Sequence, residues 1–343
     1  MRNSQKGFSL IELMISMSIM LLIAGAATTA LLKMTSAQAT IWNRTQMHSG
    51  IRGATEVLQQ EVGQAGRIAL PNVVTLGGGP VTAGLSQTVT VACLSTCALG
   101  TTATSGMFLG QRLVIDAGCY DTANPCTSRQ ETIRITATPT STQITAVFAN
   151  AHGAGASIAV FGAFASGVVP PATTPYTNGS SGTVLKLYGD INSDGKMVYV
   201  EYSCDIPAAV GGVQSPGNLY RNSMAWDAGA PSAAPTASQI LLSNIMPNPD
   251  GSACFTYQTL GVSIDDDGVS STPPVMTYFV TDVAITLTVQ TQILDPVTKQ
   301  FQTETKALLN VSPRNVFHAW TLASLGLSDR IQAMPPTVTL LLP

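Results

Sequence analysis

The chain begins with a long apolar run that a single charge interrupts. Residues 8–32 contain one ionisable side chain, Glu12. As a helix this run would be about 37 Å long, enough to cross a hydrocarbon core of about 30 Å. Because Arg2 and Lys6 precede the run, the positive-inside rule predicts a cytoplasmic N-terminus, with the rest of the chain beyond the membrane.

The hydrophobic pattern becomes amphipathic in the next part of the chain. Apolar residues recur there at steps of three and four, which is the spacing of one helix face: Met47, Ile51, Ala54, Leu58, Val62 and Ala65. Pro71 marks the end of the helix at the latest. We therefore predict one helix over residues 8–67, about 90 Å long. Its first half would lie in lipid or a filament core, and its second half would pack on a globular domain.

Short β-branched alternations bounded by Gly, Pro, Asn or Asp replace the helical pattern after Pro71. They predict strands at residues 88–92, 112–115, 131–137, 143–148, 183–188, 197–202, 282–291 and 305–311. In the strand at 282–291, branched apolar residues alternate with small or polar ones, which indicates one buried and one solvated face. The predicted fold class is α+β, with one long helix packed against an antiparallel β-sheet.

These patterns also predict the division of the chain into segments. In chain order we expect a leader peptide at 1–7, the helix at 8–67 with a transmembrane part at 8–32, the start of the globular β domain at 68–106, an inserted small β module at 107–164, a linker at 165–182, the main antiparallel domain at 183–320 and a C-terminal tail at 321–343. The linker is predicted from its glycine, proline and serine content. Residues 337–342 are expected to form a last apolar strand, which either closes the sheet or offers an edge to a partner subunit.

The composition bears on one class of partner, nucleic acid. Charged residues make up 10% of the 343 residues and the net charge is −3, so nothing indicates a bulk electrostatic attraction to nucleic acid or anionic lipid. The aromatic fraction of 6% also argues against a surface on which bases stack. The sequence therefore carries no signal of a nucleic-acid partner.

The six cysteines predict disulfides in an oxidising compartment, because their number is even and the N-terminus is of an export type. Proximity along the chain favours three pairs: Cys93–Cys97, Cys119–Cys126 and Cys204–Cys254. The alternative is that some of the six are buried free thiols. A zinc site is disfavoured, because the spacings do not form paired C-x₂-C knuckles.

A loop between two predicted strands matches the pattern of a calcium-binding loop. Its oxygen ligands would be Asp190, Asn192, Asp194 and Glu201, and Gly195 would permit the sharp turn. Strands rather than helices flank this loop, unlike an EF-hand. The alternative is a hairpin turn in which Asp and Asn side chains accept hydrogen bonds from backbone N–H groups. Both interpretations stay open, and Ca²⁺ is the one candidate cofactor.

No catalytic motif is evident. The histidines, His48, His152 and His318, lie far apart in the sequence, and none belongs to an H-E-x-x-H pattern. No G-x-S-x-G elbow is present either. We therefore predict that the protein is not an enzyme.

Glu12 separates two interpretations of the N-terminus. A cleaved secretory signal peptide would use the small residues at 24–26 and would gain nothing from a carboxylate in its apolar core. If the chain is instead cut after Gly7 and keeps the apolar run, Phe8 acquires a cationic α-amino group. That amine would pair with Glu12 of a neighbouring subunit, since charges within a membrane need such partners. Glu12 thus favours a retained helix that assembles with others.

The stretch K-G-F-S-L-I-E-L, residues 6–13, resembles the class III leader of type IV pilins and type II secretion pseudopilins. This resemblance implies that a prepilin peptidase cleaves between Gly7 and Phe8 and methylates the Phe8 amine. It also implies that Glu12 neutralises this amine while subunits dock.

Five weaker segments, which occur in order, resemble the PilW-type minor pilins and the J-type minor pseudopilin: residues 218–221, 240–245, 255–257, 283–287 and 312–315. The resemblance implies a minor subunit of a type IV pilus that joins other minor and major pilins in a priming or tip complex. It implies a single-pass protein in inner-membrane lipid, with a periplasmic β domain that later faces outward on a filament. The alternatives are a pseudopilin of a type II secretion system, and a tip adhesin or DNA-uptake subunit.

Overall fold

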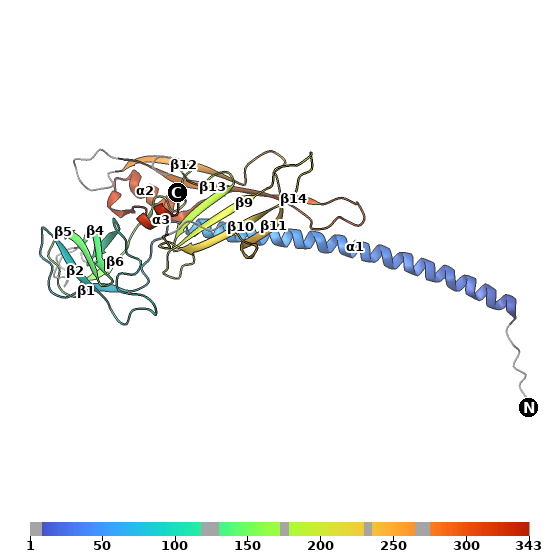
Figure 1. Cartoon of the computed structure of the whole chain (residues 1–343), viewed down its shortest axis with the longest axis horizontal. Coiled ribbons are helices and arrows are strands. Elements are labelled where there is room, and N and C mark those ends of the chain that lie inside the picture. The colour runs from blue at the N-terminus through green and yellow to red at the C-terminus, as the bar shows by residue number, and fades with distance from the viewer. Residues whose placement is uncertain (1–8, 118–129, 172–177, 230–234, 265–274, 343) are drawn as a thin grey trace, which may run out of the picture.

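The computed structural model describes residues 9–117, 130–171, 178–229, 235–264 and 275–342. Helix α1 (Leu10–Gln64) projects from an elongated β-rich body, so that the first turns of the helix lie far from the rest of the molecule (Figure 1). The predicted α+β class is confirmed. The predicted helix at 8–67 is also found, with ends that differ by two or three residues.

The second half of α1 is held by its apolar stripe. All six stripe residues are buried, with exposed fractions from 0% to 9%: Met47, Ile51, Ala54, Leu58, Val62 and Ala65. They share one core with the main sheet and with α2 (Arg314–Ser324), to which α2 contributes Val316 and Ala319. This half of the helix is therefore part of the hydrophobic core of the globular domain.

The main sheet has seven antiparallel strands. These are β8 (Val184–Gly189), β9 (Val198–Asp205), β10 (Gly217–Ala225), β11 (Ile240–Met246), β12 (Phe255–Ile264), β13 (Val275–Gln290) and β14 (Thr303–Val311), with a 3₁₀ turn, η1 (Ala237–Gln239), before β11. Their order is β12-β13-β11-β10-β9-β8, and β14 also pairs with β13. The strand predicted at 282–291 is the second half of β13, whose apolar residues face the core: Val283, Ile285, Leu287 and Val289.

The smaller β module is a closed six-stranded barrel, and its boundaries differ from the prediction. Its strands are β1 (Val74–Gly77), β2 (Leu85–Cys93), β3 (Arg112–Ile115), β4 (Glu131–Thr140), β5 (Gln143–Phe148) and β6 (Ser157–Ala159), in the order β1-β2-β5-β4-β3-β6. The predicted limits of 107–164 are wrong, because β1 pairs with β6 and β2 pairs with β5. Residues 74–93, assigned above to the start of the main β domain, are thus part of the barrel.

The segment predicted as a linker is packed where the structure describes it. Just after α1, the Gly66 N–H donates to the Tyr188 carbonyl at 2.9 Å. The chain crosses itself here so closely that a Cβ on Gly167 would lie 2.1 Å from the Gly66 Cα, which only glycine permits. Val168 and Val169 follow with no exposed surface. Residues 165–171 are therefore part of the core, and their glycine serves a close contact rather than flexibility.

The C-terminal tail folds back and joins the two β regions. Strand β15 (Ile331–Gln332), preceded by a 3₁₀ turn, η2 (Ser328–Arg330), pairs in parallel with β7 (Ala163–Phe164). The Gln332 amide donates to the Arg112 carbonyl at 3.0 Å and accepts from the Arg112 N–H at 2.9 Å. The expected last strand at 337–342 is wrong: this segment forms a short helix, α3 (Pro336–Leu340), with proline in its first turn.

Candidate assembly and membrane site

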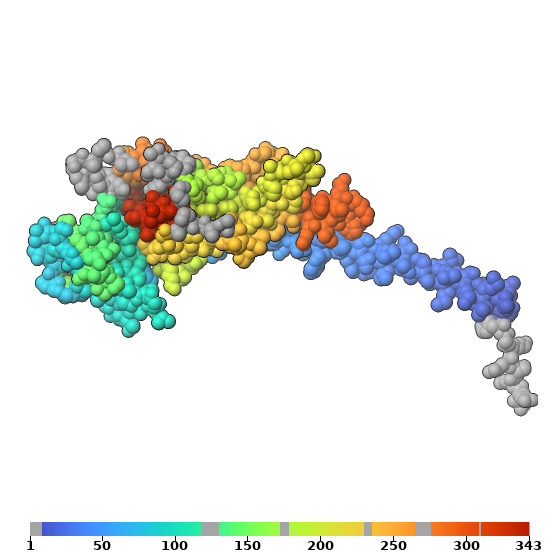
Figure 2. Space-filling view, viewed as in Figure 1, coloured from blue at the N-terminus to red at the C-terminus, as the bar shows by residue number. Residues whose placement is uncertain are grey.

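The N-terminal half of α1 exposes apolar side chains all around. From Leu10 to Leu32, every large apolar residue is at least half exposed, up to 77% at Leu10. Figure 2 shows this part of the helix free of the rest of the molecule. Among the described residues, this is the one helix that is long and apolar enough to cross a membrane. Such a surface is stable only in lipid or against other apolar helices.

Glu12 lies in the first turn of this apolar helix. Its backbone N–H donates to the Ser9 carbonyl at 3.0 Å, and its side chain is exposed. No hydrogen bond or ion pair reaches its carboxylate from any residue that the structure describes. Gly7 and Phe8, where we predict cleavage and methylation, lie outside the described residues. The carboxylate therefore needs a partner before the helix is buried in an apolar environment.

An ion pair in the core holds the other half of α1 against the sheet. Glu61 is 8% exposed and accepts hydrogen bonds from Arg221 Nη2 at 2.6 Å and Nε at 2.9 Å. The Tyr202 hydroxyl donates to the same carboxylate at 2.5 Å. Burial lowers the pKa of Arg221, but the bonds to Glu61 outweigh it and the net pKa is raised.

Sequence analysis did not identify Glu61. The signal was present, because Glu61 is three residues after Leu58 and four before Ala65 and so lies on the buried stripe. A carboxylate at such a position requires a cation from the facing element. The sequence alone could not say which arginine supplies it, since Arg221 lies 160 residues further along the chain.

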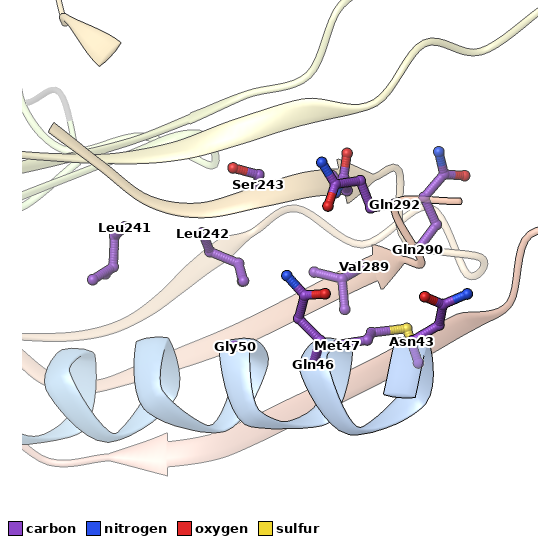
Figure 3. A pocket seen from close by; sticks show the side chains of 11 residues that line it. Asn43, Gln46, Met47, Gly50, Leu241, Leu242, Ser243, Val289, Gln290 and Gln292 are labelled. Carbon is purple, nitrogen blue, oxygen red and sulfur yellow. The ribbon is translucent and has the colours of Figure 1, made fainter. Parts of the chain in front are cut away.

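A cavity opens between α1 and the sheet near the point where the helix leaves the domain (Figure 3). Its volume is about 280 Å³. Buried Met47, Leu242 and Val289 contribute apolar walls, while amide side chains such as Gln46 and Gln292 are exposed beside them. The cavity therefore lies between the region where α1 is covered by the sheet and the region where it is bare.

Two of the three expected disulfides are present, and Cys119 and Cys126 lie outside the described residues. Cys93 is joined to Cys97 at the end of β2. Cys204 of β9 is joined to Cys254, which directly precedes β12. The second bond links elements that are not neighbours in the sheet.

The two ends of the main sheet approach each other at this second disulfide. The Phe255 N–H donates to the Gly182 carbonyl at 3.0 Å, and the Tyr257 hydroxyl donates to the Val184 carbonyl at 3.0 Å. A Cβ on Gly182 would lie 2.8 Å from the Ala253 Cβ, so glycine is required there. The start of β12 is thus tied to the start of β8.

The loop between β8 and β9 has the geometry of a hydrogen-bonded turn. Asp190 is 1% exposed, and its Oδ1 accepts the backbone N–H groups of Asp194 at 3.0 Å and Gly195 at 3.2 Å. Its Oδ2 lies 3.4 Å from Arg67 Nε. The side chains of Asn192 and Asp194 are exposed. This is the hairpin-turn alternative, stabilised by Asx hydrogen bonds.

Glu201, the fourth expected calcium ligand, makes contacts within the sheet. It lies in β9 opposite Lys186 of β8, and it accepts a hydrogen bond from the Tyr199 hydroxyl at 3.0 Å. Burial lowers the pKa of Lys186, and the Glu201 charge opposes this shift. No group of three His, Cys, Asp or Glu side chains within the described ranges is arranged to hold a metal ion. Calcium binding by this loop stays a prediction for calorimetry.

A buried histidine cluster in the barrel was also missed. His152 is 1% exposed and lies between two carboxylates, with Nδ1 2.7 Å from Asp116 Oδ2 and Nε2 2.7 Å from Glu131 Oε1. Glu131 Oε2 also accepts the Ala149 N–H at 2.8 Å. The three residues belong to distant segments, so no local motif could have indicated them. The cluster ties the loop after β5 to strands β3 and β4.

The geometry described so far is that of a membrane-anchored protein, in which a bare apolar helix is continuous with a rigid β domain. The family model for the prokaryotic N-terminal methylation motif matches residues 2–28. This match supports the prediction, made from the residues around Gly7, of a class III leader like that of the type IV pilin and pseudopilin superfamily. The motif points to a structural subunit rather than an enzyme. No curated protein and no solved structure matches the chain.

Proposed function

We propose that the protein is a minor pilin of the PilW type, which prepilin peptidase processes and which joins a priming or tip complex of a type IV pilus. The observation that carries this proposal is the exposed Glu12 carboxylate on an otherwise apolar helix. Cleavage after Gly7 would create the α-amine of Phe8 beside the same membrane leaflet. Pairing between this amine and Glu12 of an adjoining subunit would bring the apolar helices together.

In this proposal the protein first waits in the inner membrane, with its β domain in the periplasm. The apolar half of α1 then moves from lipid to the filament core, where it packs on the helices of other subunits. The core contacts of the second half, including Glu61 and Arg221, keep the β domain at a set angle to the helix. Docking of the helix would therefore also orient the β domain.

A terminal position in the filament is supported by the barrel. The barrel lies at the end of the molecule opposite the first turns of α1 (Figure 1). A subunit in the shaft has neighbours above and below, and these would have to accommodate the barrel at every turn. A subunit at the tip has no neighbour beyond it, so the additional domain meets no obstacle there.

The direct test is the Glu12→Gln variant in cells that assemble filaments. We expect its incorporation into sheared filaments to fall at least about tenfold, since the neutral amide cannot neutralise the Phe8 amine. The membrane level and the mature N-terminal mass should stay unchanged. Glu56→Gln is the matched control, because Glu56 is 61% exposed on the second half of the same helix. Normal incorporation of Glu12→Gln would refute the assembly role.

The leader is shared with pseudopilins, so a minor pseudopilin of a type II secretion system is the second candidate. A clean deletion separates the two systems: loss of surface pili supports the pilin, and loss of exported enzymes with normal pili supports the pseudopilin. Mass spectrometry of the mature N-terminus checks the step common to both. A start near residue 27 instead of Phe8 would indicate signal-peptide cleavage and would contradict both candidates.

A further inference from the structure

The loop between β13 and β14 exposes four large apolar side chains at one tip. Their exposed fractions are 54% for Ile293, 49% for Leu294, 67% for Val297 and 46% for Phe301. The loop, orange in Figures 1 and 2, extends along α1 and reaches further toward the N-terminal end of the helix than the rest of the β domain does. We call residues 291–302 the hairpin tip.

The hairpin tip is a turn that is held by hydrogen bonds and attached to α1. Asp295 is 2% exposed, and its Oδ1 accepts the N–H groups of Val297 at 2.7 Å and Thr298 at 3.0 Å. The Thr40 hydroxyl of α1 donates to the same oxygen at 3.3 Å. One turn further on, Arg44 donates to the Gln302 amide oxygen. The apolar side chains are therefore held in place beside the helix.

The adjacent surface of α1 also exposes apolar side chains. Between Lys33 and Arg44 the helix carries no charged residue. Two neighbouring side chains stand out from it, Ile41 with 64% and Trp42 with 71% exposed surface. Trp residues are enriched at the boundary between hydrocarbon and water, where one end of the ring is dry and the other wet. The hairpin tip and this uncharged stretch lie at the same level of the molecule.

That level lies just outside the headgroup layer of a bilayer that α1 crosses. If the apolar run ends in hydrocarbon near Lys33, Thr40 stands about 10 Å further along the helix axis. The polar layer adds about 5–8 Å on each side of the hydrocarbon. Because the hairpin tip extends from Thr40 back toward the N-terminal end of α1, its apolar side chains come within reach of this layer (Figure 1).

We propose that the hairpin tip is a second membrane contact that inserts into the headgroup layer of the leaflet where α1 leaves the bilayer. The chemistry favours lipid over a protein partner, because the charged side chains of the tip suit a membrane surface. Asp295 is buried, and exposed Lys299 can extend its cation to lipid phosphates. The contact would fix the tilt of the β domain above the membrane and would break when the subunit is extracted into a filament.

The test uses the full chain in vesicles of phosphatidylethanolamine and phosphatidylglycerol, seven to three, in a Trp42→Phe background. Three added tryptophan probes are compared, each after subtraction of the signal of the Trp42→Phe parent, which keeps Trp226 and Trp320. They are Phe301→Trp in the hairpin tip, Ile23→Trp in the apolar half of α1, and Leu99→Trp in the barrel segment, where the native side chain is fully exposed. A spin-labelled headgroup lipid should quench Phe301→Trp at least about twofold more than Leu99→Trp. Acyl-chain brominated lipid should quench Ile23→Trp most. Leu294→Trp serves as a second probe if Phe301→Trp folds poorly.

The inference rests on the membrane-spanning placement of α1, and the probes separate the two. Quenching of Ile23→Trp without quenching of Phe301→Trp or Leu294→Trp would refute the second contact and leave the anchor intact. An unquenched Ile23→Trp would refute both. If the hairpin-tip probes are shielded only after other subunits are added, the tip binds protein and the lipid contact is refuted.

Discussion

The barrel and the main sheet bury their apolar faces in different ways. The barrel closes on itself, and its core is formed by its own strands together with the loops between them, with Leu113, Ile144 and Phe148 fully buried. The main sheet does not form a closed barrel, although the starts of β8 and β12 are tied together, and α1 and α2 complete its core. The barrel is therefore a self-contained addition, whereas the main sheet and the second half of α1 form one unit.

This difference has a functional consequence. A helix that only tethered the domain could leave the β domain free to rotate. Because α1 supplies part of the core of the main sheet, the orientation of its bare half and that of the sheet are coupled. Changes in the main sheet should then disturb assembly, and changes confined to the barrel should not.

The largest expected effect compares the two disulfides. The Cys204–Cys254 bond spans 50 residues of the main domain, and the chain-entropy model gives about 4 kcal/mol for it. The Cys93–Cys97 bond spans 4 residues in the barrel region, for which the same model gives about 2 kcal/mol. Double serine variants of each pair, unfolded in urea under oxidising conditions, measure both. Equal losses would contradict the stated ranking.

The second-largest expected effect concerns the burial of α1 in the core of the main sheet. Leu58 is fully buried, so Leu58→Ala should lower the unfolding free energy by about 3 kcal/mol. Leu22 lies on the bare half with 75% exposure, and Leu22→Ala should leave the melting of the β domain unchanged. Thermal unfolding in detergent, followed by circular dichroism, measures both. A similar shift from both variants would mean that the two halves are not distinct.

The ion pair within this core should contribute less. Glu61→Gln keeps the shape of the side chain but removes the charge that Arg221 and Tyr202 face, and we expect a loss of about 2 kcal/mol. Arg221→Met in the same background should then cost little more, since the two changes remove one interaction. A double-mutant cycle in urea gives the coupling. Additive losses would show that the pair contributes nothing of its own.

The smallest effect concerns the hairpin tip. Hydrogen bonds from the Thr298 and Val297 N–H groups lower the pKa of Asp295 below its ordinary 3.8, despite the opposing effect of burial. A lowered folded-state pKa means that the contribution to stability is present above pH 3.8 and is lost as the pH falls through the folded value. Asp295→Asn should therefore speed amide exchange at Val297 and Thr298 at pH 6.

The control for this prediction is Asp205→Asn, at an exposed position at the end of β9. It should not change exchange in the hairpin tip. Unchanged exchange in Asp295→Asn would show that the carboxylate charge does not hold the turn. Hydrogen exchange followed by mass spectrometry of the peptide that contains residues 291–302 resolves the difference.

Local patterns of the sequence predicted much of this molecule. The helical stripe from Met47 to Ala65 and the alternation in β13 were correct, because burial on one face repeats along a single element. Glu12 was apparent for a similar reason, as a charge within an apolar run, and its role in assembly stays a prediction. The barrel limits were wrong, because the pairing of β1 with β6 joins segments more than eighty residues apart.

Two other errors have the same origin in tertiary contacts. Glycine and proline near Gly167 suggested a linker, but the glycine is needed where the chain passes Gly66. The apolar residues after Pro336 suited a short helix as well as a strand, and packing decided for the helix. Glu61 was missed because its partner Arg221 lies on another element, and the contact of Asp295 with Thr40 of α1 was missed for the same reason.

The amino-acid sequence alone determined three features: an apolar helix near the N-terminus, a single charge, Glu12, within its apolar run, and β structure after it. Each of these depends only on residues that are near one another along the chain. Only the tertiary structure decided that α1 belongs to the core of the main sheet, that Arg221 neutralises Glu61, and that an apolar hairpin tip lies beside Thr40. These depend on which distant segments meet, and that is settled by packing the whole chain at once.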